Sequence, residues 1–221
     1  MPLDLYLDTA DTALWDALMP IGMFSGITTN PLLAKRAGLA YPDIDWSEMA
    51  RKAAGLGAKE LHAQVFGAAE TYAPWADALL EAGEKAGIRT VVKVPLVEAA
   101  IREVPRLKAG GCPILMTACY DVKQVFVATS LGADFIAPYF GRMQEAGLPA
   151  FEMLGQMAAI QKSGGTRVLV ASLRSTEQMC ELSGIGCDCF TISPDIARAL
   201  LSDDLSLAAV NDFEIAARGR T

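Results

Sequence analysis

The sequence has few of the residues that build metal sites and disulfide scaffolds. It contains one histidine, His62, and five cysteines, none of them in a C-x-x-C pair. One histidine cannot form a histidine-based metal centre, and an odd set of scattered cysteines argues against a disulfide framework. Cys187 and Cys189 would share one face of a strand, where two small buried hydrophobic residues are a simpler interpretation than two metal ligands. We therefore expect no metal ion and a reducing compartment.

Long apolar runs and basic clusters are also missing. No uncharged stretch reaches the roughly 18 apolar residues of a membrane span, and the first residues lack the basic and apolar regions of a signal peptide. The 19 Lys and Arg against 26 Asp and Glu give a net charge of −7, with no Lys/Arg-rich run. This balance disfavours nucleic acid and anionic membranes as partners. We expect a cytoplasmic protein, in which a local basic pocket could still bind a phosphate.

What the sequence does contain is an alternation of strand-like and helix-like segments. Several of the strand-like runs are apolar nearly throughout, as parallel strands buried on both faces are. Glycine ends several of the helix-like segments, and Pro105 interrupts one of them. The eight predicted strands are 3–8, 25–29, 60–66, 90–96, 113–118, 134–140, 167–173 and 187–192.

This alternation predicts an α/β fold, a single (β/α)₈ TIM barrel over residues 1–221. The length suits one such barrel, which commonly needs about 200–250 residues. A doubly wound open sheet would carry a glycine-rich phosphate turn after its first strand, and residues 6–15 contain no G-x-G-x-x-G. Residues 206–221 are predicted to add a C-terminal helix, whose placement the sequence does not give.

Polar residues gather at the ends of the predicted strands, where barrels of this kind build their active sites. Seven of the eight strands deliver a hydrogen-bonding or ionisable side chain to that end. These residues are Asp8, Thr28, Thr29, Asn30, Gln64, Lys93, Thr117, Tyr139 and Ser172.

Lys93 is the most informative of these residues. It lies between Val92 and Val94 in an apolar strand, where a charged ammonium is costly to bury. An ordinary lysine has about one neutral amine in 2,500 molecules at pH 7, and desolvation raises that fraction by lowering the pKa. A neutral amine in an apolar pocket can attack a carbonyl carbon. The alternative is a structural ion pair with Asp8, and the strand context alone does not separate the two.

Seven short motifs, in order over nearly the whole chain, resemble those of the small transaldolase-like proteins and, within them, the fructose-6-phosphate aldolases. They are YLDTAD (6–11), GITTNP (26–31), HAQVF (62–66), VVKVPL (91–96), TACY (117–120), APYFGR (137–142) and ASLRS (171–175). The resemblance implies a (β/α)₈ barrel that binds its ketone substrate as a Schiff base on Lys93. It implies no metal or organic cofactor, and a homo-oligomer of five or ten subunits in which the C-terminal helix reaches a neighbour.

The resemblance also implies roles for the other residues. Asp8, Thr28 and Asn30 would hold substrate hydroxyls. Gln64, Thr117 and Tyr139 would order a water that carries protons to and from the enamine carbon. Arg142, Ser172 and Arg174 would bind the phosphate of a sugar-phosphate acceptor.

Purely structural roles remain possible for some of these residues. Without the resemblance, Arg142 and Arg174 would read as rim salt bridges, and Tyr139 as a half-buried aromatic residue. We interpret His62 as a packed core residue.

Two activities fit this chemistry. An aldolase protonates the three-carbon enamine and releases a ketone, whereas a transaldolase passes it to a second aldehyde. Transaldolases of this superfamily usually carry Glu at the position of Gln64 and Phe at the position of Tyr139, so both positions favour an aldolase, although Arg174 is typical of transaldolases. We expect reversible cleavage of fructose 6-phosphate to dihydroxyacetone and glyceraldehyde 3-phosphate. The alternatives are a transaldolase and a non-catalytic barrel that binds sugar phosphates.

Overall fold

The computed structural model describes residues 3–219, apart from the side chain of Ser163. Eight parallel strands form one sheet in the order β7-β6-β5-β4-β3-β2-β1-β8. An isolated bridge between Val170, just after β7, and Phe190 of β8 brings the two ends of the sheet together and closes the barrel. The predicted (β/α)₈ fold is confirmed. The strands are β1 (Asp4–Asp8), β2 (Gly26–Thr28), β3 (Glu60–Gln64), β4 (Arg89–Pro95), β5 (Ile114–Cys119), β6 (Phe135–Pro138), β7 (Arg167–Val168) and β8 (Cys189–Ile192).

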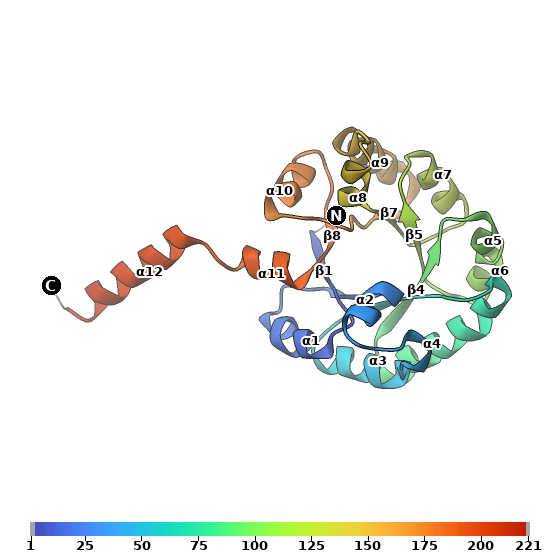
Figure 1. Ribbon diagram of the computed structural model, residues 1–221, viewed down its shortest axis with the longest axis horizontal. Helices are drawn as coiled ribbons and strands as arrows, with labels where there is room; N and C mark the ends of the chain where they lie inside the picture. Colours follow the sequence, from blue (N-terminus) through green and yellow to red (C-terminus); the bar gives the residue numbers. More distant parts are fainter. Residues whose placement is uncertain (1–2, 220–221) are drawn as a thin grey trace.

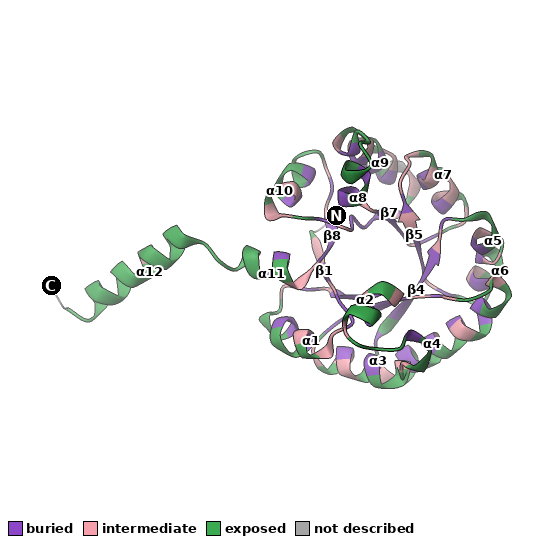
Figure 2. Cartoon of the chain, viewed as in Figure 1, coloured by how far each residue is buried: buried purple, intermediate pink, exposed green. Residues whose placement is uncertain are grey.

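Helices surround the barrel, with their buried faces turned toward the strands (Figures 1 and 2). Most of them begin at a capping side chain or a proline, as the caps at Asp11, Asn30 and Asp45 show. The helices are α1 (Thr12–Leu18), α2 (Pro31–Arg36), α3 (Trp46–Gly55), α4 (Tyr72–Ala86), α5 (Glu98–Ile101), α6 (Val104–Ala109), α7 (Lys123–Ser130), α8 (Phe140–Glu145), α9 (Ala150–Gly164), α10 (Thr176–Gly184), α11 (Pro194–Leu200) and α12 (Asp204–Ala217), with short 3₁₀ turns at Met19–Ile21, Tyr41–Asp43 and Ala69–Thr71.

The seventh strand is the largest departure from the expected boundaries. We predicted it over 167–173, but regular pairing covers only Arg167–Val168. Beyond that point the backbone bonds alternately to its two neighbours: Leu169 N–H donates to Ile136 O, and Val170 N–H donates to Cys189 O. Ser172 then turns into the left-handed region at φ 63° and ends the extended run. The predicted third and sixth strands are shorter too, ending at Gln64 and Pro138.

The predicted interruption at Pro105 and the C-terminal helix are both present. Pro105 lies in the first turn of α6, because proline is tolerated at the start of a helix but not in its interior. The predicted extension over 206–221 is α12, which begins two residues earlier, at Asp204; residues 220–221 lie outside the described part. Figure 1 shows α12 standing clear of the barrel. Among residues 3–219, none of the helices combines the length and the hydrophobicity that crossing a bilayer requires.

Two apolar clusters make up most of the core within residues 3–219, and a small third one lies around Ala10, Ala34 and Tyr41. A large cluster fills the space between the strands and the helices, and a smaller one fills the barrel itself with Tyr6, Val91, Leu115, Phe135, Leu169 and Cys189 among its members. His62 is fully buried in the barrel, with its ring 4.9 Å from that of Tyr6 and 5.2 Å from that of Phe135. The interpretation of His62 as a packed core residue is confirmed, and Cys187 and Cys189 are buried free cysteines.

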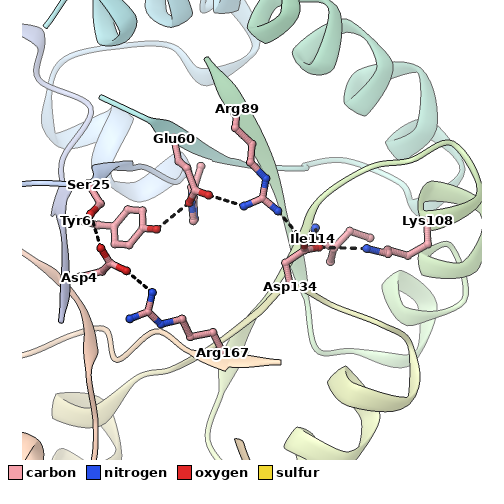
Figure 3. A network of polar contacts seen from close by, with 10 residues as sticks. Asp4, Tyr6, Ser25, Glu60, Arg89, Lys108, Ile114, Asp134 and Arg167 are labelled. Atoms are coloured by element: carbon pink, nitrogen blue, oxygen red, sulfur yellow. Dashed lines mark hydrogen bonds and ion pairs between the residues drawn. The ribbon is translucent and has the colours of Figure 1, made fainter. Parts of the chain in front are cut away.

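Charged side chains close the N-terminal end of the barrel (Figure 3). Arg89 joins Glu60 to Asp134, and Arg167 pairs with Asp4. Burial raises the pKa of Glu60, but hydrogen bonds from His62, Tyr6 and Arg89 outweigh it and hold the pKa at about 2. This end of the barrel is therefore a paired structural plug, and the opposite end is left for a site.

Candidate active site

A cavity of about 460 Å³ opens at the C-terminal end of the barrel, a size that suits a small metabolite. Its wall is built from the ends of the strands and the segments that follow them. Eight of the ten predicted site residues line it: Asp8, Asn30, Gln64, Lys93, Tyr139, Arg142, Ser172 and Arg174. The other two, Thr28 and Thr117, lie just behind the wall and hydrogen-bond to residues that line it.

Lys93 lies in the wall of this cavity, on the central part of β4. Its side chain is only 4% exposed, and burial lowers the pKa of its amine, with the nearby Asp8 carboxylate opposing the shift. Within residues 3–219, no ion pair or hydrogen bond joins the amine to a carboxylate. Lys93 and Asp8 therefore do not form the structural ion pair that was the alternative. The amine is buried, shifted toward its neutral form and adjacent to open volume.

Asp8 is held by its neighbour on β2. The Thr28 hydroxyl donates to Asp8 Oδ1 at 2.6 Å. Asp8 is the only acidic residue among those that line the cavity. A carboxylate fixed at this position can accept a hydrogen bond, or a proton, from a bound hydroxyl.

Tyr139 and Thr117 form a second pair. The Thr117 hydroxyl lies 2.8 Å from the Tyr139 hydroxyl, and the Arg142 guanidinium stacks over the Tyr139 ring at 5.1 Å from its centre. Burial raises the pKa of Tyr139, although the bond to Thr117 opposes the shift. The phenol therefore stays protonated at neutral pH and can take part in hydrogen bonds at the cavity wall.

Asn30 and Gln64 are positioned by backbone contacts. The Asn30 side-chain oxygen caps α2 by accepting from the N–H groups of Leu32 and Leu33, which leaves its amide nitrogen as a donor. The Tyr41 hydroxyl donates to Gln64 O at 2.6 Å and accepts from Gln64 N–H at 2.8 Å. This clamp fixes the backbone at the end of β3.

The two predicted phosphate-binding arginines differ in their partners. Arg142 donates a long bond, 3.4 Å, to the Tyr120 hydroxyl. Arg174 donates to Glu145 Oε1 from Nε at 3.1 Å and from a terminal nitrogen at 2.7 Å. Gly141 permits this arrangement, because a Cβ there would collide with Ser172 O and approach the Arg174 guanidinium to 3.2 Å. The rim salt bridge that we considered is thus present at Arg174.

Sequence reasoning missed several features of the site. Thr191 on β8 lines the cavity, and its position two residues after Cys189, on the same face of the strand, could have revealed it. Arg36, an exposed cation on α2, also lines the cavity. Ala118 takes a left-handed φ of 58°, as Ser172 takes 63°, and no sequence signal marks an alanine for that conformation. Such strained positions gather at functional sites.

The fold and the cavity define a (β/α)₈-barrel protein with a buried, pocket-lining lysine. Comparison with known families places it further: the chain matches the Transaldolase/Fructose-6-phosphate aldolase family over residues 5–218, and it belongs to that family. It is accordingly an enzyme of the aldolase or transaldolase kind, acting in carbohydrate metabolism.

Curated relatives cover almost the full chain. A probable transaldolase of Phenylobacterium zucineum (strain HLK1) is 29% identical over 213 residues, 96% of this chain and 94% of its own. A probable transaldolase of Dinoroseobacter shibae (strain DSM 16493 / NCIMB 14021 / DFL 12) is 30% identical over 220 residues, 95% of each chain.

Solved structures resemble the chain in fold alone. A thiamine phosphate pyrophosphorylase from Pyrococcus furiosus superposes with a TM-score of 0.60 at 15% identity, over 89% of this chain and 91% of its own. A mandelate oxidase variant superposes with a TM-score of 0.61 at 21% identity, over 89% of this chain and 66% of its own, so the chain spans just under two thirds of that protein.

Proposed function

We propose that the protein is a class I aldolase that cleaves fructose 6-phosphate reversibly to dihydroxyacetone and glyceraldehyde 3-phosphate. The observation that carries this proposal is Lys93, an amine with a lowered pKa in the wall of an open cavity. Free amine is the form that attacks a ketone, and its fraction at neutral pH rises as the pKa falls.

The proposed reaction runs through a covalent intermediate. The Lys93 nitrogen attacks the C2 carbonyl and water leaves, giving an iminium ion. A base takes the proton of the C4 hydroxyl, the C3–C4 bond breaks, and its electrons move to the iminium nitrogen. Glyceraldehyde 3-phosphate departs, the enamine gains a proton at C3, and hydrolysis frees dihydroxyacetone. None of these steps needs a metal ion or an organic cofactor.

Residues on the cavity wall match the needs of these steps. Asp8 and Asn30 present an acceptor and a donor for substrate hydroxyls, with Thr28 behind Asp8. Gln64, Thr117 and Tyr139 supply the groups that order a proton-carrying water. Arg142, Ser172 and Arg174 lie together at the rim, where two guanidinium forks and a hydroxyl suit a phosphate dianion.

A transaldolase is the second candidate. The names of the relatives favour it, as does Arg174, whereas Tyr139 and Gln64 favour the aldolase. The Tyr139 hydroxyl lies in the cavity wall and pairs with the Thr117 hydroxyl, and this placement supports enamine protonation and hence release of the ketone.

Borohydride reduction in the presence of dihydroxyacetone tests the Schiff base. We expect a covalent mass increase on Lys93 that is lost in Lys93→Ala and kept in Lys85→Ala, an exposed lysine on α4. Absence of trapping would favour a barrel that only binds sugar phosphates.

Release of dihydroxyacetone from fructose 6-phosphate separates the two enzymatic candidates. We expect release without an added acceptor, and Tyr139→Phe should shift the balance toward transfer to erythrose 4-phosphate. Release that depends on the acceptor would make the protein a transaldolase.

The protein is also proposed to form a homo-oligomer, a pentamer or a decamer, through α12. Five large apolar side chains of this helix are exposed in the single chain: Leu205, Leu207, Val210, Phe213 and Ile215. No residue of α12 is buried, and Figure 2 shows the helix exposed along its length.

A further inference from the structure

Thr191 lies on β8, the one strand for which the sequence offered no site residue. Its side chain is 3% exposed and lines the cavity. Strand β1 pairs with β8 on one side and with β2 on the other. Thr191 of β8 and Thr28 of β2 meet across β1 inside the barrel, with their Oγ1 atoms 2.5 Å apart.

The direction of this contact follows from counting hydrogens. Each threonine hydroxyl has one hydrogen to donate, and an ionised carboxylate has none. Thr28 gives its hydrogen to Asp8 Oδ1, so the hydrogen in the contact between the two threonines comes from Thr191. The three groups form one chain, from Thr191 to Thr28 to Asp8, in which each bond polarises the next.

We propose that Thr191 is a positioning residue that fixes the Asp8 carboxylate through Thr28. This inference rests on the proposed function of the site. Asp8 is the only acidic side chain among the cavity-lining residues, so it is the group suited to take a proton or a hydrogen bond from the substrate hydroxyl at the bond that breaks. Because Oδ1 accepts the hydrogen bond from Thr28, the carboxylate is held in one orientation. Its second oxygen is then available to the substrate hydroxyl.

Thr191→Val keeps the shape of the side chain and removes its hydroxyl. We expect kcat for fructose 6-phosphate cleavage to fall roughly 3- to 10-fold, the worth of about one buried hydrogen bond, with KM changed less than about twofold. Thr191→Ser restores the hydroxyl and should recover most of the rate. Thr90→Val is the matched control, because Thr90 is equally buried on β4 but bonds to Leu79 O behind the barrel wall.

A double-mutant cycle tests whether Thr191 acts through Thr28. If it does, Thr28→Val already breaks the chain, and adding Thr191→Val should slow kcat no further. Additive losses, a Thr191→Ser variant as slow as Thr191→Val, or a Thr191→Val variant with the parent kcat would each overturn the proposal. If Thr191→Val fails to fold, Thr191→Ala against Thr191→Ser carries the same comparison.

Two further measurements separate this proposal from the proposed function. Failure of borohydride to trap dihydroxyacetone on Lys93 of the parent protein would overturn the function itself. Urea unfolding of the same four proteins of the cycle reports the hydroxyl contact without any turnover. We expect coupling between positions 28 and 191 in the unfolding free energy. Its absence would overturn the proposed series of hydrogen bonds from Thr191 through Thr28 to Asp8.

Discussion

At the scale of single residues, the chemistry of the site depends on the balance of two effects on Lys93. Burial lowers the pKa of its amine, and the Asp8 carboxylate raises it. Asp8→Asn removes the opposing effect, so the pKa of Lys93 should fall further and free amine should persist to lower pH. The rate of Schiff-base formation with dihydroxyacetone, followed by borohydride trapping against pH, should rise at lower pH than in the parent.

The matched control for this prediction is Asp11→Asn, at the N-cap of α1 and outside the cavity wall. Asp11→Asn should leave the pH dependence of borohydride trapping unchanged. An Asp8→Asn profile that moves to higher pH, or stays where it is, would contradict the electrostatic account of Lys93.

Glu145 gives a second prediction at this scale. It occupies the Arg174 guanidinium, so a bound phosphate has to compete with it. Both side chains are exposed, and such pairs are worth about 0.2–1 kcal/mol. Glu145→Gln should therefore lower KM for fructose 6-phosphate by about 1.5- to 5-fold and leave KM for unphosphorylated fructose in place.

Glu152→Gln on α9 is the control, since Glu152 bonds only to Gln156 of its own helix among the described residues. Equal effects of Glu145→Gln on both substrates would mean that Arg174 does not bind the phosphate.

At the scale of elements, sequence patterns predicted where each strand lies better than where it ends. Apolar runs revealed all eight strands, because burial on both faces leaves a strong signal. The end of β7 was missed because Ser172 takes a left-handed φ of 63°, a conformation that its residue type does not favour. Polar residues at strand ends predicted six of the residues that line the cavity, whereas the contacts of Thr191 and Glu145 depend on elements far apart in the sequence.

The contact between α8 and the segment that follows β7 yields a prediction about stability. Gly141→Ala places a methyl group against Ser172 O and the Arg174 guanidinium, and the backbone must shift. We expect a loss of about 1–3 kcal/mol in the free energy of unfolding. Gly55→Ala at the end of α3 is the matched control, because nothing lies within 4 Å of its Cβ, and it should be neutral or slightly stabilising. Equal unfolding free energies for the two variants would contradict the close approach of Ser172 to α8.

At the scale of the whole molecule, the plug beneath the barrel predicts sensitivity to acid. Burial lowers the pKa of His62 below its ordinary value of 6.5, so near pH 6 and below the unfolded chain binds a proton that the folded chain does not. Stability should fall in that window by at most about 1.4 kcal/mol per pH unit. A second loss follows below pH 4.5, as the pH falls toward the pKa of Glu60 at about 2.

His62 is the only histidine in the sequence, so the first window can be tested cleanly. His62→Gln should flatten the unfolding free energy between pH 7.5 and 5.5, whatever its effect on absolute stability. A slope that survives the substitution would assign the acid sensitivity to other groups.

The exposed C-terminal helix makes the last prediction. Apolar residues occupy most sides of α12, and a helix of that kind is stable in water only when something covers it. The proposed cover is a neighbouring copy of the chain. Phe213→Asp introduces a charge where a 69% exposed phenylalanine is available for contact, and it should reduce the mass in solution, measured by light scattering, toward that of one chain. Glu214→Gln, which changes the next residue without adding a charge, should leave the assembly intact. Because the cavity is built from a single barrel, the dissociated chain should still trap dihydroxyacetone on Lys93; loss of trapping together with dissociation would mean that the assembly completes the site.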